Sequence, residues 1–269
     1  SKITDSMPSV YQLLPSENYF NSLNTDYSYY FFDWVGDNKR LNFSDTKQYL
    51  KDQGRNLSLI DKADDFHGEI DNLRPTDYGV ETYNIVGCGT PTLGKIYVLS
   101  QEDSDYDYAI KMINGDGTVP LRSAEAMLAN KTYYVNEAQH ATMPSSSGVK
   151  ELVISILKNE NIFDKTNYSN ILDASDSCSI PDGKLVSFHS PITLRIKDQY
   201  GNYAGPNEND DIENNIEGLV YEVIEDTKFA HLPNGINYTV YGEATGSGYF
   251  DIRVETIDNG EVAKTDLYN

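Results

Sequence analysis

NGDGTVPL, at residues 114–121, is the stretch from which the rest of the chain is interpreted. It places Asp116 between two glycines, and His140 follows in a later loop. Between them, an amphipathic run at 124–128 predicts a short helix and a β-favouring run at 132–135 predicts a strand. The order is therefore an acid in a turn, a helix, a strand and a histidine in a loop.

Apolar residues recur after His140 at the spacing of one buried helical face. They are Val149, Leu152, Val153, Ile156 and Leu157. Three serines, Ser145 to Ser147, come just before them, and we interpret these as N-cap residues of the helix rather than as nucleophiles. An acid and a histidine at the ends of successive strands is the way α/β-hydrolases present the last two members of a catalytic triad.

Four segments, in this order, resemble the lecithin:cholesterol acyltransferase family of α/β-hydrolase lipases, phospholipases and acyltransferases. They are PSVYQLLP (8–15), IVGCGTPT (85–92), GDGTVP (115–120), and His140 with the helix after it. The resemblance covers roughly residues 7 to 158. It implies that Asp116 is the triad acid, that His140 is the general base and that the substrate is an ester or a lipid. This chemistry requires no metal and no organic cofactor.

The nucleophile of that family has no counterpart in the sequence. It lies in a G-x-S-x-G elbow ahead of the acid, and the 269 residues contain no such motif. We therefore expect the chain to be the C-terminal part of a longer hydrolase or acyltransferase, to need the missing N-terminal half of the hydrolase domain, and to be inactive alone. The alternative is a non-catalytic secreted or surface binding protein in which the hydrolase remnant is a scaffold.

Composition excludes several function classes. The 42 acidic against 21 basic residues give a net charge of −21, which argues against a nucleic-acid partner, because phosphates are bound by Lys and Arg. No apolar run approaches the roughly 20 residues that span a bilayer, so we predict no transmembrane segment. The two cysteines, Cys88 and Cys178, make no disulfide framework, and free buried thiols are expected.

The N-terminal 75 residues and the acidic loop at 101–107 each allow two interpretations. Residues 16–75 are rich in aromatic side chains and include Trp34, which fits either an acyl-binding lid or a satellite core under an insertion. The loop joins two predicted strands at 95–99 and 108–112. Its aspartates alternate as in a calcium loop, but the required glycine and glutamate are missing, so a solvated turn is preferred.

The chain is predicted to divide at a polar linker, residues 161–182. Residues 1–160 are expected to form the C-terminal part of an α/β-hydrolase with a cap insertion. Residues 183–269 carry short alternating runs between turns and predict a small all-β sandwich. This second part resembles modules of bacterial surface and secreted proteins, which implies an extracellular or cell-surface location and either a packing role or carbohydrate binding.

Overall fold

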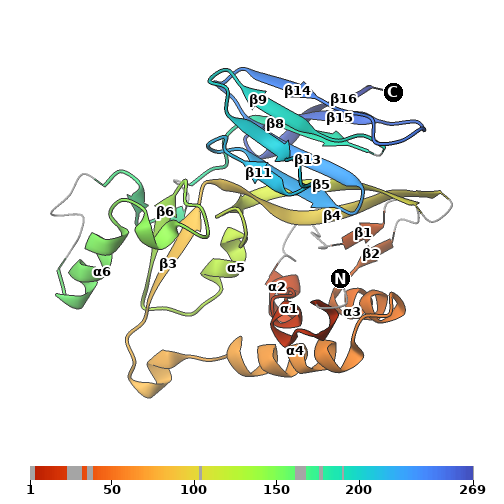
Figure 1. Cartoon of the computed structure of the whole chain (residues 1–269). Coiled ribbons are helices and arrows are strands. Elements are labelled where there is room, and N and C mark those ends of the chain that lie inside the picture. The colour runs from red at the N-terminus through yellow and green to blue at the C-terminus, as the bar shows by residue number, and fades with distance from the viewer. Residues whose placement is uncertain are drawn as a thin grey trace.

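The computed structural model describes residues 4–22, 32–34, 39–102, 105–160, 168–175, 178–189 and 191–268. Figure 1 shows two layers of strands at the top, the long β4–β5 hairpin beneath them, and helices α1 to α4 below the hairpin. The strands β3 and β6 and the helix α6 lie to one side.

Short helices and strands alternate along the first 172 residues, and the elements that the structure describes after them are all strands. The helices are α1 (Pro8–Gln12), α2 (Glu17–Ser22), α3 (Phe43–Asp52), α4 (Leu57–Ile70), α5 (Leu121–Glu125) and α6 (Val149–Leu157). The strands up to residue 172 are β1 (Phe32–Trp34), β2 (Lys39–Leu41), β3 (Tyr83–Cys88), β4 (Thr90–Glu102), β5 (Asp105–Gly115), β6 (Lys131–Asn136) and β7 (Ile171–Leu172). The later strands are β8 (Gly183–Phe188), β9 (Arg195–Asp198), β10 (Tyr203–Pro206), β11 (Ile212–Asn214), β12 (Val220–Ile224), β13 (Thr227–Pro233), β14 (Tyr238–Tyr241), β15 (Ile252–Asp258) and β16 (Glu261–Tyr268).

The predicted α/β-hydrolase fold is wrong. Strands account for 37% of the residues and helices for 26%, and most strand pairs are antiparallel. The parallel pair β3–β6 has only the short antiparallel β7 beside it, in a sheet of order β3-β6-β7. After β3 the chain leaves this sheet to form the β4–β5 hairpin, which pairs with β1. A strand–helix–strand pattern in sequence does not determine how many parallel strands join it.

Residues 183–268 form two sheets face to face, which is compatible with the predicted β-sandwich. Their orders are β11-β10-β9-β14 and β12-β13-β8-β15-β16. Side chains from both sheets meet in one core, where Phe188 and Ala230 of the second sheet lie in the same cluster as Ile196 and Ala204 of the first. The sequence did not predict β10, β11 or β16, which are short or mostly exposed and therefore lack a strong apolar alternation.

The five-stranded sheet is also covered on its other face, by the β4–β5 hairpin. Ile110 and Met112 of β5 share a cluster with Leu185 and Phe229 of that sheet. A strand covered on both faces buries consecutive residues, and β13 is buried from Phe229 through Leu232. The hairpin, which precedes the predicted linker, thus packs against the sandwich.

The N-terminal helices form a small separate core. Tyr11 of α1 packs with Leu59, Ile60 and Ala63 of α4. Asn42 caps α3 by accepting a 2.9 Å hydrogen bond from the Asp45 N–H group. The side chains of residues 23–40, which include most of the aromatic side chains of residues 16–75, lie outside the described residues, so the lid stays a prediction.

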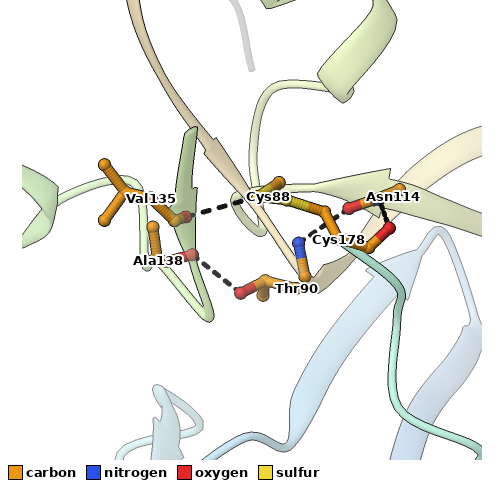
Figure 2. Close-up of a disulfide and its surroundings, with 7 residues drawn as sticks. Cys88, Thr90, Asn114, Val135, Ala138 and Cys178 are labelled. Atoms are coloured by element: carbon orange, nitrogen blue, oxygen red, sulfur yellow. Dashed lines mark hydrogen bonds between the residues drawn. A yellow bond between two sulfur atoms is a disulfide. The ribbon is translucent and has the colours of Figure 1, made fainter. Parts of the chain in front are cut away.

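The two cysteines are joined in a disulfide, which corrects the prediction of free thiols. Cys88 ends β3, and Cys178 lies in the segment before the sandwich, with Cα atoms 5.9 Å apart. Figure 2 shows Asn114 beside the bond, where its side-chain amide donates to the Cys178 carbonyl oxygen and its oxygen accepts from the Gly89 N–H group. Sequence could not pair them, because 90 residues separate the two and only the fold brings β3 to this segment.

Acid is expected to destabilise the protein through His231 on β13. The imidazole is fully buried, and burial lowers its pKa to about 4, although the Pro181 carbonyl acts in the opposite sense. Because the ordinary pKa of histidine is about 6.5, the stability that depends on neutral His231 is fully present above pH 6.5 and is lost as the pH falls toward 4. The free energy of unfolding should fall by roughly 3 kcal/mol over this range.

Urea unfolding at a series of pH values measures this loss. A His231→Leu variant should show a shallower decline between pH 6.5 and 4, whereas His189→Gln, which changes a partly exposed histidine, should decline like the wild type. Equal slopes for wild type and His231→Leu would contradict the assignment.

Candidate functional site: the Asp116 and His140 pair

Asp116 and His140, far apart in the sequence, form a hydrogen-bonded pair. The Nδ1 atom of His140 lies 2.8 Å from Oδ2 of Asp116, and the backbone N–H group of His140 donates to the Asp116 carbonyl oxygen at 2.8 Å. The aspartate side chain is only 7% exposed, whereas the histidine side chain is 50% exposed. One partner is therefore held in the protein and the other faces solvent.

The second carboxylate oxygen of Asp116 is held by the chain that follows it. Oδ1 accepts hydrogen bonds from the N–H groups of Thr118 at 3.0 Å and Val119 at 2.7 Å. An aspartate in an Asp-Gly turn commonly accepts such bonds from its own backbone. Here they leave Oδ2 for the imidazole and prevent the carboxylate from rotating away.

Small residues beneath Asp116 allow the close approach that the pair requires. A Cβ atom on Gly87 of β3 would lie 2.6 Å from the Cβ of Asp116, and one on Gly115 would lie 2.4 Å from the Thr92 hydroxyl oxygen. That hydroxyl also accepts a 2.8 Å hydrogen bond from the Gly117 N–H group. Thr92 ends the segment 85–92 that carries the family resemblance, but the sequence predicted no role for its hydroxyl.

The loop that carries His140 is fastened to the start of β4. The Thr90 hydroxyl donates to the Ala138 carbonyl oxygen at 2.7 Å, as Figure 2 shows, and the Ala138 N–H group donates to the Cys88 carbonyl oxygen at 3.3 Å. His140 therefore follows β6 on a loop tied to both β3 and β4. These contacts orient the imidazole toward Asp116.

Nε2 of His140 has no hydrogen-bond partner among the described parts of the chain. Ser145 is the nearest serine in sequence, and its hydroxyl donates instead to the Thr142 carbonyl oxygen at 3.0 Å. The predicted N-cap role of the three serines is wrong, because Gly148, at φ 84°, occupies the N-cap position of α6 without a side-chain cap. A serine there would have to adopt a left-handed backbone that glycine adopts freely.

The other histidines have different surroundings. His67 on α4 pairs with Asp71 at 3.3 Å, one helical turn away. Nε2 of His189 lies 3.3 Å from the Ser187 hydroxyl, but Ser187 is only 4% exposed in a central strand, so an ester could not reach it. His231 is fully buried.

Metal-binding and membrane-spanning features can be assessed for the same residues. Within the described ranges, His, Cys, Asp and Glu side chains do not gather in threes that could hold a metal ion. The side chains of the acidic loop at 101–107 lie outside those ranges. None of the helices placed by the structure is long and apolar enough to cross a bilayer.

The chain matches no known family model, and no curated protein matches it significantly. The resemblance to the lecithin:cholesterol acyltransferase family stays a prediction.

Proposed function

We propose that Asp116 and His140 are the acid and the general base of a site that transfers an acyl group from a carboxylic ester or lipid to water or to an alcohol. The observation that carries the proposal is the 2.8 Å contact between a buried carboxylate and the Nδ1 atom of a half-exposed imidazole. This geometry is the one required of an acid–histidine pair, and it recurs on unrelated folds. The proposal therefore does not depend on an α/β-hydrolase core.

The roles follow from the contacts. Oδ2 of Asp116 accepts the Nδ1–H bond, which selects the tautomer whose Nε2 carries a lone pair. Nε2 removes the proton of a serine hydroxyl as its oxygen attacks the ester carbonyl, and it returns that proton to the departing alkoxide. Water or an acceptor alcohol then repeats the same proton transfers and releases the acyl group.

The nucleophile is proposed to come from a segment outside the described residues. The hydroxyl of Ser145 donates to the Thr142 carbonyl oxygen, and Nε2 of His140 accepts no hydrogen bond from the described residues. An extracellular or cell-surface location is part of the proposal. The Cys88–Cys178 disulfide is compatible with it, since disulfides persist in oxidising compartments.

The experiment is an esterase assay of the complete translation product of the gene, beside residues 1–269 alone. The complete product should release p-nitrophenol from p-nitrophenyl butyrate and should be labelled by a fluorophosphonate. Residues 1–269 alone should do neither, because they contain no G-x-S-x-G nucleophile elbow. A complete product that neither hydrolyses esters nor reacts with the probe would overturn the proposal.

A non-catalytic binding protein is the second candidate. The observation that favours it is the exposure of aromatic side chains in the sandwich turns, with Tyr200 74% and Tyr249 99% exposed. Isolated exposed aromatics are common on protein surfaces, but flat rings can stack against sugars. Retention on an insoluble polysaccharide, lost in Tyr249→Ser, together with an inactive complete product, would favour this candidate.

A further inference from the structure

A cavity of about 450 Å³ lies where the sandwich meets the first half of the chain. Its wall combines β5, α5, the segment at Cys178 and the turn between β15 and β16. Its volume is in the range of small-molecule sites, which often form between structural units. None of the residues that line it belongs to the Asp116–His140 pair.

One side of the cavity is apolar. Met112, Leu121 and Ile180 line it and are themselves almost completely buried, and the half-cystine Cys178 adjoins them. Burying an alkyl chain against such a surface is favourable in proportion to the area removed from water. This wall therefore suits the hydrocarbon part of a ligand.

The acidic groups around the cavity already have partners. Glu261 accepts two 3.0 Å bonds from the Lys111 ammonium, and Glu125 accepts a hydrogen bond from the Tyr134 hydroxyl. Their negative charges are thus partly satisfied within the protein.

Arg122 is the basic group without an acidic partner here. Its guanidinium donates to the Ser22 carbonyl oxygen at 3.0 Å, and no carboxylate pairs with it in the described part of the chain. It also lies near Tyr19, where burial raises the pKa of the phenol and the arginine charge lowers it. A guanidinium has five N–H donors, so several remain for a ligand.

We propose that this cavity binds an amphiphilic monocarboxylate, with its alkyl chain on Met112, Leu121 and Ile180 and its carboxylate on Arg122. Arginine and a carboxylate form charge-assisted, often bidentate, hydrogen bonds. The net charge of −21 repels an anion in the cavity little, because screening at physiological ionic strength limits the repulsion to charges within about 8 Å. The contact with Arg122 therefore determines that the cavity attracts a carboxylate.

Calorimetric titration of oxidised residues 1–269 with octanoate tests the proposal, with octylamine and octan-1-ol as probes of the same chain length. Octanoate should bind saturably and octylamine at least about tenfold more weakly, since the ammonium would face Arg122. Arg122→Gln should weaken octanoate binding by about tenfold or more and leave octanol unchanged. Arg55→Gln, which removes an exposed arginine paired with Asp5, is the matched control and should change neither.

A second variant addresses the apolar wall. Ser179→Trp puts a large side chain at the exposed rim and should weaken octanoate and octanol alike. Equal affinity for octanoate and octylamine in the wild type, or no saturable octanoate binding, would overturn the proposal even if a variant failed to fold. These measurements use no turnover, so they stand or fall separately from the proposed acyl transfer.

Discussion

Replacing Asp116 with asparagine is expected to lower the kcat of the complete translation product for ester hydrolysis by about 10⁴-fold. The reason lies in the two hydrogen bonds that Oδ1 accepts from the Thr118 and Val119 N–H groups. They should hold the asparagine oxygen at the Oδ1 position and turn its NH₂ group toward His140. The imidazole would then have to accept at Nδ1 and carry its proton on Nε2, where it cannot act as a base.

Two readouts separate this mechanism from simple unfolding. Steady-state kinetics should show the loss mainly in kcat, and nitrogen NMR of His140 should show the change of tautomer. Asp71→Asn is the matched control, because it alters the other aspartate–histidine pair, on α4, and should leave turnover unchanged. A wild-type kcat in the Asp116→Asn protein would show that Asp116 is not the acid of the proposed site.

Loss of the Cys88–Cys178 disulfide is expected to lower the free energy of unfolding by about 3–5 kcal/mol. The bond closes a long loop, because its two cysteines are 90 positions apart, and so it restricts the unfolded chain strongly. It also fastens the end of β3 to the segment that enters the sandwich. Cys88→Ala combined with Cys178→Ala avoids placing new hydroxyl groups at two buried positions.

Urea unfolding with and without dithiothreitol measures the contribution. The wild type should lose stability in the reductant, and the double variant should be unaffected by it. The reduction of the disulfide is checked separately. If the reduced wild type keeps the same urea midpoint, the disulfide adds nothing to stability. Because Cys88 adjoins Gly87, which lies under Asp116, the NMR signal of His140 should also shift on reduction.

Local elements were largely predictable from sequence. The helix after His140 corresponds to α6, the strand before it to β6, and the two runs around the acidic loop to the β4–β5 hairpin. Each has a periodic pattern or a turn residue that acts over a few positions. Gly54 acts in the same local way, because its left-handed φ of 72° lies just past the end of α3, where glycine commonly terminates a helix.

The errors concern partners distant along the chain. The prediction of an α/β-hydrolase fold was wrong because β4 pairs with β1 and β5 packs on the sandwich. Neither the pairing nor the packing can be recognised in the local sequence pattern. The prediction of free thiols was wrong for the same reason, because the disulfide joins two distant segments. His231 carries no local sign of its complete burial, because the alternating run around it does not show which surfaces cover the strand.

By itself, the sequence determined the local conformations, because turn chemistry and apolar periodicity operate within a few residues. Asp116 and His140 were singled out through the family resemblance of their segments. Tertiary structure alone decided that Asp116 and His140 meet, that two distant cysteines bond, and that a cavity opens beside Arg122. These outcomes depend on which surfaces pack together, and burial of apolar area is favourable for many pairings that a single sequence does not distinguish.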